Sequence, residues 1–260
     1  MKVLLLLATS MSLLSAETGQ ERGKRLIDEA IAALGGDTFL QMKDRVEDGR
    51  AYSFYRDELS GLSRAKIYTQ YVTPAEKGKL AVRERQSFGR DEYSSVLFNR
   101  EGGWEITYRG ARPLRNEQIE RYRDSTRNNI FYIFRTRLKE PGMIFDSRGA
   151  EVWENQPVEN IDITDSENHV VSLSIHHSTK LPVRQVFYRR DPETRERIEE
   201  VTIYSKYRDV GGVQWPYTIQ RIRNGEKVYS MFSESVTINQ NLPDTLFMLP
   251  SGIKKLPPKR

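Results

Sequence analysis

The sequence contains no cysteine among its 260 residues. Disulfide bonds and cysteine metal ligands are therefore excluded, and an exported form of the protein would depend on its core for stability. Histidine is also scarce, with only His169, His176 and His177 present. Adjacent residues on a strand point to opposite faces, so His176 and His177 cannot bind one metal ion from the same strand. We expect neither a metal site nor a cofactor.

Sequence motifs for common enzyme chemistry are missing as well. There is no G-x-S-x-G nucleophile elbow and no G-x-x-x-x-G-K-[ST] phosphate loop. Carboxylate pairs such as Glu199-Glu200 lie in charged runs, which are typical of a solvated surface. We therefore expect a binding protein with no catalytic residues. A hydrolase that uses an unrecognised pair of carboxylates stays open as an alternative.

Positive charge is present but is not concentrated. The 41 Lys and Arg residues are mixed with 36 Asp and Glu residues, which leaves a formal net charge of +5. The only dense basic stretch is Lys254–Arg260 at the C-terminus. Nucleic-acid-binding proteins gather basic residues on one face. The mixture predicts an ordinary solvated surface and no nucleic-acid partner.

The N-terminus has the pattern of a secretory signal peptide over residues 1–16. Lys2 precedes the Leu-rich run Val3–Leu14, and the small pair Ser15-Ala16 precedes a polar stretch. The run is shorter than the roughly 20 apolar residues that span a bilayer. We expect export with cleavage near Ala16, and an uncleaved N-terminal anchor is the alternative. No cysteine follows that could be lipidated, so the mature form is expected to be soluble.

The last third of the chain predicts four consecutive antiparallel strands. Apolar and polar residues alternate in most of this region, as on a sheet with one dry and one wet face. Asn224-Gly225 is a strong hairpin signal between two of the runs. The predicted strands are Leu181–Arg190, Arg197–Tyr207, Val213–Arg223 and Lys227–Asn239.

The first half predicts one helix followed by more strands. Apolar residues recur at helical spacing in Glu21–Leu34, and Gly35-Gly36 ends that helix. Further strands are expected between Met143 and His176, which makes about ten or eleven in all. With no linker or repeat, residues 17–250 are expected to form one domain, and residues 251–260 a solvated tail. The predicted early strands are Val46–Tyr55, Leu62–Val72, Leu80–Phe88, Tyr93–Asn99 and Trp104–Tyr108.

A helical insertion, Leu114–Leu138, interrupts the strands. Its apolar stripe needs cover, so the insertion is expected to cross one face of the sheet. Asp124-Ser125 is a candidate cap that would divide it into two helices. The residues on one helical face are Ile119, Tyr122, Thr126, Ile130, Ile133 and Phe134.

Aromatic side chains are spread over the predicted strands, and each could simply pack in a core. A wide sheet crossed by a few amphipathic helices could also leave a concave apolar space that binds a ligand. The residues predicted to form the lid or line that cavity are Tyr52, Phe54, Trp104, Ile119, Tyr122, Ile130, Ile133, Phe134, Trp215 and Tyr217.

Several turn and strand-end motifs resemble the LolA-like outer-membrane lipoprotein-sorting proteins. The resemblance covers most of the mature chain, and it is specific for fold rather than for activity. The motifs that carry it are Leu34-Gly35-Gly36, Asp48-Gly49-Arg50, Lys180-Leu181-Pro182, Tyr207–Pro216, Asn224-Gly225, Asn239 and Phe247–Pro250.

This resemblance implies a mainly β (α+β) fold: a strongly curved, incomplete antiparallel β-barrel whose concave face is covered by helices. It also implies a monomeric periplasmic carrier, with an apolar cavity for the acyl chains of lipids or lipoproteins. The partners would be those acyl chains and a membrane-associated donor or acceptor protein. A sensing or regulatory module of the cell envelope on the same fold is the alternative.

Overall fold

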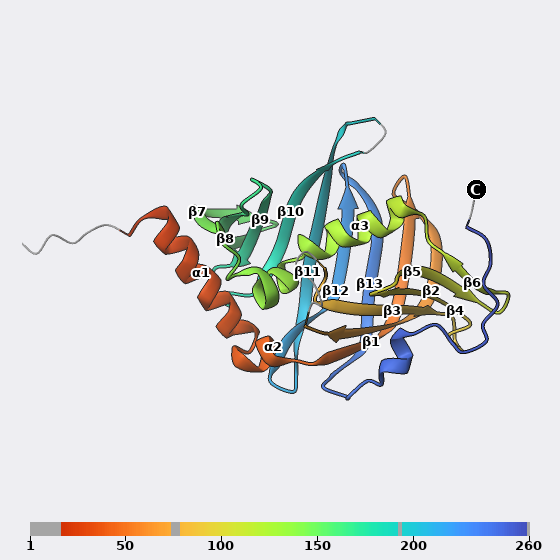
Figure 1. Cartoon of the computed structure of the whole chain (residues 1–260). Helices are drawn as coiled ribbons and strands as arrows, with labels where there is room; N and C mark the ends of the chain where they lie inside the picture. Colours follow the sequence, from red (N-terminus) through yellow and green to blue (C-terminus); the bar gives the residue numbers. More distant parts are fainter. Residues whose placement is uncertain (1–16, 74–78, 192–193, 259–260) are drawn as a thin grey trace, which may run out of the picture.

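The fold is a single large antiparallel sheet with helices at one end and on one face (Figure 1). The computed structural model describes residues 17–73, 79–191 and 194–258. In those ranges thirteen strands lie in the order β6-β5-β4-β3-β2-β1-β13-β12-β11-β10-β9-β8-β7. The strands are β1 (Asp44–Tyr55), β2 (Glu58–Tyr71), β3 (Val82–Phe88), β4 (Ser94–Asn99), β5 (Gly102–Thr107), β6 (Gly110–Pro113), β7 (Ile144–Trp153), β8 (Gln156–Thr164), β9 (Val170–His176), β10 (Pro182–Arg190), β11 (Arg197–Val210), β12 (Val213–Arg223) and β13 (Glu226–Ile238).

The strand order explains why helices cover the concave face. Strands that are consecutive in the chain pair with each other, except β6 and β7, and β1 also pairs with β13 in the middle of the sheet. Strands β6 and β7 are consecutive in the chain but form the two opposite edges of the sheet. Their connection must therefore travel from edge to edge, and it does so over the concave face (Figure 1).

Local signals define the first helix, α1 (Gly19–Leu34), at both ends. Thr18 and Glu21 form a reciprocal capping box at its start, and Gly35 ends it with a left-handed φ of 119°. Gly23 lets the helix approach closely, because a Cβ there would lie 2.4 Å from the carbonyl oxygen of Phe145 in β7. A short helix, α2 (Asp37–Gln41), follows.

The insertion contains three helical pieces, which are α3 (Asn116–Arg127), α4 (Ile130–Tyr132) and the π-helical turn η1 (Ile133–Arg137). The prediction that Asp124-Ser125 divides the segment was wrong. The break falls at Asn128, and the side-chain oxygen of Asn129 caps α4 by accepting from the N–H groups of Phe131 and Tyr132. Asp124 and Ser125 lie inside α3 instead.

Other differences from the sequence analysis concern strands. The expected ten or eleven strands are thirteen. Strand β6 was missed because it has four residues and includes both Gly110 and Pro113, which are turn signals. Part of the tail that was expected to be solvated pairs with this strand, since Ala111 bonds to the backbone of Lys254 and Leu256 at 2.9 and 2.8 Å. The remaining element is η2 (Asp244–Phe247), a 3-10 turn.

The predicted signal peptide, residues 1–16, lies outside the described residues. Within the described part of the chain, no helix is both long enough and apolar enough to cross a membrane.

Candidate functional site in the sheet's concave face

The concave face is divided into a dry part and a hollow part. Helix α1 and the pieces α4 and η1 pack with strands β8–β12 into the main apolar core. Ile130, Ile133 and Phe134 are between 0% and 2% exposed there. Helix α3 crosses the other part of the face, over β11–β13, and none of its side chains, all of which the structure describes, is fully buried (Figure 1). A cavity lies beneath it.

The cavity has a volume of about 510 Å³, which lies within the range of roughly 300–1,000 Å³ that is usual for small-ligand sites. Its walls come from strands β1–β4 and β11–β13 and from helices α3 and α4. The wall contains aromatic and aliphatic groups, among them Phe98, Tyr122, Phe131, Tyr204, Trp215, Ile219, Tyr229 and Met231. It also contains the charged groups Arg45, Glu47, Glu84, Arg121, Glu200, Arg221 and Arg223. The cavity is thus amphipathic, whereas an apolar cavity was expected from the sequence.

Arg45 organises the cavity floor. Its guanidinium lies 4.0 Å from the ring centre of Trp215 and donates hydrogen bonds to Glu47 (2.8 Å), Tyr71 (2.7 Å) and Thr69 (3.1 Å). The side chains of Arg45 and Glu47 are only 9% and 3% exposed. A charge removed from water to this degree needs such partners. This network therefore holds the floor in one arrangement.

Glu84, on β3, also faces the cavity and accepts a hydrogen bond from Gln86. Burial raises the pKa of the Glu84 carboxyl, although Gln86 and Arg45 pull it in the opposite direction. Because folding raises the pKa of Glu84, ionisation of this carboxyl destabilises the folded state at pH values above the raised pKa. The destabilisation vanishes at pH values below the pKa that Glu84 has in the unfolded chain.

Replacing Glu84 by glutamine should therefore stabilise the protein at pH 7.5, raising Tm by about 2 °C or more, and should have no effect near pH 4. Thermal unfolding of wild type and E84Q across this pH range measures the difference. The control is Glu101→Gln on the exposed β4–β5 turn, which should change Tm equally little at both pH values. A gain for E84Q that stays constant with pH would contradict this assignment.

Helix α3 is attached to the sheet by few apolar contacts. The Tyr122 ring stacks on Phe98 of β4 with ring centres 3.6 Å apart and planes 3° from parallel. Ile119 packs near Gly103, where a Cβ would come within 3.1 Å of it. The next piece, α4, is held more firmly, because the Ile130 N–H donates to Gln185 (2.8 Å). The insertion thus joins α3, which has few contacts with the sheet, to α4, which is bonded to β10.

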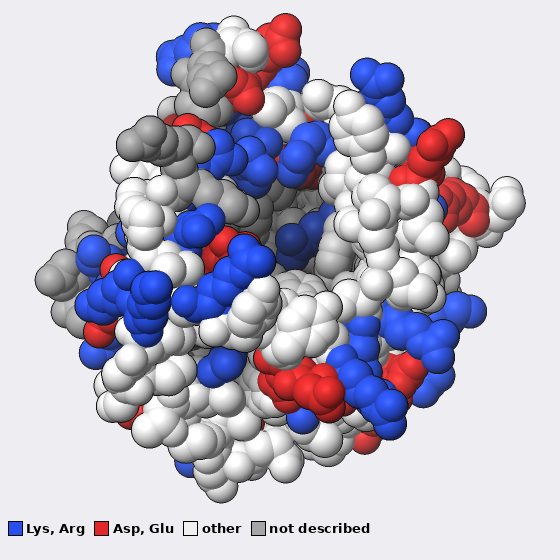
Figure 2. All heavy atoms as spheres, turned by 90° about the vertical axis from the view of Figure 1, so that its right-hand side faces the viewer, with Lys and Arg blue, Asp and Glu red and all other residues white. Residues whose placement is uncertain are grey.

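One end of the cavity is rich in arginine. Arg189 and Arg223 both donate to the same oxygen of Glu200, at 2.9 and 3.0 Å. Arg121 of α3 has no carboxylate within ion-pair distance in the described part of the chain. Burial, and then repulsion from Arg223 and Arg189, lowers the pKa of the Arg121 guanidinium. In Figure 2 a hollow is visible from the β6 end of the molecule, with basic side chains at its rim and in its depth.

Solved structures with this architecture identify the fold. A DUF1329 family protein from Desulfovibrio piger superposes with a TM-score of 0.58 at 11% identity, covering 89% of this chain and 98% of that one. A domain described as an outer membrane lipoprotein-sorting protein, from Vibrio parahaemolyticus, gives 0.55 at 12% identity, with 88% and 97% covered. A LolA superfamily protein from Nitrosomonas europaea gives 0.53 at 12% identity, with 87% and 97% covered.

The fold is LolA-like. This confirms the resemblance drawn from the turn motifs. Comparison of the sequence with models of known families and with curated proteins finds no match. At these identities the similarity concerns the fold alone.

The LolA-like fold brings only some of the predicted site residues to the cavity. Tyr122 and Trp215 line it. Ile130, Ile133 and Phe134 are core residues instead, because the segment turns inward after Asn129. Ile119 holds α3 to the β4–β5 hairpin. Trp104 joins a separate cluster around Leu97 and Phe247, and Tyr217 packs at the edge of the main core. Tyr52 contacts the ring of Phe232, and Phe54 contacts Lys227.

The charged residues of the cavity were not predicted from the sequence, although the period-two alternation of the strands places them on the same face as the apolar residues. The predicted dry face of β12, with Val213 and Trp215, continues with the same period into Arg221 and Arg223. The face of β3 that carries Val82 also carries Glu84. Charged residues in phase with an apolar face indicate a wet interior, but alternation alone cannot show that these strands face one another.

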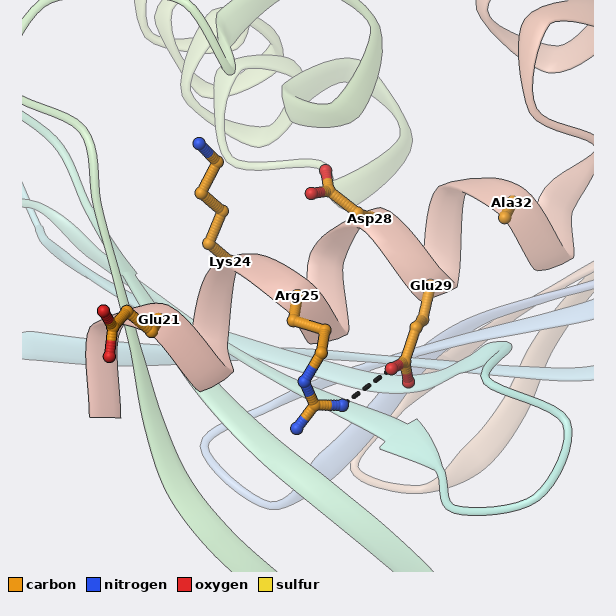
Figure 3. A pocket seen from close by; sticks show the side chains of 6 residues that line it. All are labelled: Glu21, Lys24, Arg25, Asp28, Glu29 and Ala32. Atoms are coloured by element: carbon orange, nitrogen blue, oxygen red, sulfur yellow. Dashed lines mark hydrogen bonds and ion pairs between the residues drawn. The ribbon is translucent and has the colours of Figure 1, made fainter. Parts of the chain in front are cut away.

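Two other features carry no site. A shallow depression on the solvent side of α1 is crossed by the ion pair of Arg25 with Glu29, and is lined by Glu21, Lys24, Arg25, Asp28, Glu29 and Ala32 (Figure 3). Among the described residues, no group of three or more His, Asp or Glu side chains could hold a metal ion. His177 contacts Glu159 at 3.1 Å, and His176 accepts backbone N–H groups from its own turn.

Proposed function

We propose that this protein is an exported, periplasmic carrier that binds the acyl chains of a lipid or lipoprotein without a chemical step. The observation that supports the proposal is the cavity under α3, a helix with no fully buried side chain that covers a hollow lined by aromatic and aliphatic groups. Each methylene buried there would contribute about 0.8 kcal/mol to binding. The charged groups of the wall keep water or a ligand headgroup at the same site.

The proposal is tested by organic extraction of the purified mature protein followed by mass spectrometry, and by titration with a fluorescent fatty acid. Bound lipid and saturable fatty-acid binding are expected. Protein that is repeatedly empty and has no affinity for the fatty acid would contradict carriage of acyl chains.

Ligand entry requires α3 to move, with Asn128 and Asn129 as its hinge. Tyr122→Ala removes the stack on Phe98, which contributes about 0.5–1.5 kcal/mol to holding the helix closed. Both the association and the dissociation rate constants of a fluorescent fatty acid should rise about two- to tenfold in stopped-flow measurements. The control is Tyr108→Ala, since Tyr108 is 84% exposed and does not line the cavity. If only the dissociation rate constant rose, Tyr122→Ala would have removed a contact with the ligand and would not have eased the opening of α3.

A second candidate function is an envelope sensor that passes a signal to a membrane-associated protein partner. It is favoured by apolar side chains exposed around the β1–β2 hairpin, where Tyr55, Leu59 and Leu62 are 67%, 58% and 59% exposed. Incubation of lipid-loaded protein with inner- and outer-membrane vesicles separates the two functions. Transfer of lipid to the outer-membrane fraction supports carriage, and stable, ligand-dependent binding to one inner-membrane protein supports sensing.

A further inference from the structure

The arginine-rich end of the cavity has more positive charge than the carboxylates of the cavity lining balance. Arg189 and Arg223 pair with the single carboxylate of Glu200, and Arg121 is close enough to interact electrostatically with these three residues and with Glu117 of its own helix. Glu200 is 12% exposed and already accepts from two of them. Arg121 approaches from α3 without an ion-pair partner in the described ranges. This group of four residues is called the arginine cluster below.

The neighbouring lining does not compensate for this charge. Arg221 lies two residues before Arg223 on the same face of β12, with its guanidinium 5.6 Å from the ring centre of Tyr229 and within electrostatic range of Glu84. The remaining carboxylates of the wall are Glu47, which is engaged by Arg45, and Glu84, whose burial disfavours its ionised form. The cavity thus has a net positive end, and a group bound there would meet guanidiniums that are ready to donate.

The apolar wall begins beside the arginine cluster. Along β11 the inward residues run from Glu200 through Thr202 to Tyr204, and along β12 from Arg223 through Arg221 to Ile219. Tyr204 and Trp215 both contact the ring of Phe131, with centres 4.9 and 4.8 Å apart. One ligand could therefore place a charged group on the arginines and an apolar chain against these rings.

We infer that the ligand is an anionic amphiphile whose phosphate or carboxylate head binds Arg121 and Arg223, while its chain lies against Tyr204, Phe131 and Trp215. This inference rests on the proposed function and specifies its ligand class. Arginine donates paired hydrogen bonds to both kinds of head, and charge-assisted bonds are stronger than neutral ones. A neutral head would leave the exposed Arg121 guanidinium with water as its partner.

The arrangement also links ligand binding to closure. Arg121 is carried by α3, whereas Arg189 and Arg223 belong to the sheet. Without an anion Arg223 and Arg189 repel Arg121 more than Glu200 attracts it, and an anion between the guanidinium groups turns this repulsion into attraction. The anionic head therefore stabilises the closed position of α3, and a neutral ligand of equal chain length does not.

The experiment compares four probes on the delipidated, full-length mature protein by isothermal titration calorimetry, below their micelle concentrations. The probes are dodecyl phosphate, dodecanoate, dodecyl maltoside and inorganic phosphate. We expect both anionic amphiphiles to bind at least tenfold more tightly than the maltoside, with an affinity that falls as salt increases. Arg121→Gln should weaken the anionic probes about tenfold and leave the maltoside unchanged.

Arg123→Gln is the matched control, since Arg123 lies on the same helix, is 45% exposed and pairs with Glu120 outside the cavity lining. It should change none of the affinities. Equal binding of dodecyl phosphate and dodecyl maltoside, or an equal loss of both in Arg121→Gln, would overturn the inference and leave lipid carriage intact. Inorganic phosphate that binds as tightly as dodecyl phosphate would also overturn it, because the chain would then contribute nothing. If no amphiphile binds, the proposed function fails as well.

Discussion

Replacing Ile133 and Phe134 together by aspartate is expected to prevent folding. Both side chains lie in the main core, 1% and 2% exposed, between α1 and the sheet. Burying a carboxylate there without a partner costs several kcal/mol, and removing the Phe134 ring alone costs about 3–5 kcal/mol. The sum is comparable to the whole net stability of a domain, about 5–15 kcal/mol. The double variant should show no cooperative urea transition and no native near-ultraviolet circular dichroism.

Ile119→Asp is the matched control for this prediction, because Ile119 belongs to the same insertion but is only half-buried on α3. It should retain a cooperative transition. A double variant that unfolds cooperatively at the wild-type midpoint would contradict the assignment of α4 and η1 to the core. It would favour the original prediction that these residues belong to a lid.

Replacing Arg45 by methionine is expected to cost about 3–5 kcal/mol of the free energy of unfolding. The change leaves Glu47 only 3% exposed and without its cation, and it removes the donors to Thr69 and Tyr71. The loss reflects an uncompensated buried charge and not the net value of the ion pair. The second change Glu47→Leu should therefore restore most of the stability that Arg45→Met removes. Urea unfolding followed by tryptophan fluorescence measures wild type, Arg45→Met and the Arg45→Met, Glu47→Leu double variant.

Arg50→Met is a suitable control on the same strand. Arg50 pairs with Glu234 at 3.1 Å, but the two side chains are 63% and 49% exposed. Exposed pairs of this kind contribute about 0–1 kcal/mol, so the control should change little. Similar losses for Arg45→Met and Arg50→Met would show that the Arg45 network is solvated and does not organise the cavity floor.

Local signals in the sequence predicted much of this architecture. The capping residues of α1, the left-handed Gly35 and the Asn224-Gly225 hairpin each act through neighbouring backbone groups, so they can be read without knowing the fold. Strand β6 was missed because much of its support comes from pairing, with β5 on one side and with the backbone of Lys254 and Leu256 on the other. A four-residue strand has too few side chains for alternation to be recognised.

The insertion shows where helical periodicity ceases to be informative. Ile119, Tyr122, Ile133 and Phe134 fall on one face of a continuous helix, so they were predicted to share one role. The break at Asn128 separates them, and it is fixed from outside the segment by Gln185, which accepts from the Ile130 N–H and donates to the Asn128 carbonyl. These contacts come from β10, more than 50 residues away in the chain.

Apart from β6 and the break at Asn128, the order of strands, turns and helices was already determined by the sequence, since alternation, caps and glycine turns act over a few residues. The tertiary structure alone decided that β6 and β7 would be opposite edges, that their connection would therefore cross the concave face, and that part of that face would stay hollow. It also brought Arg45, Arg121 and Arg223 from β1, α3 and β12 into one cavity. Their charges interact through space over distances that no local pattern encodes, and so the amphipathic character of the cavity became visible only in the fold.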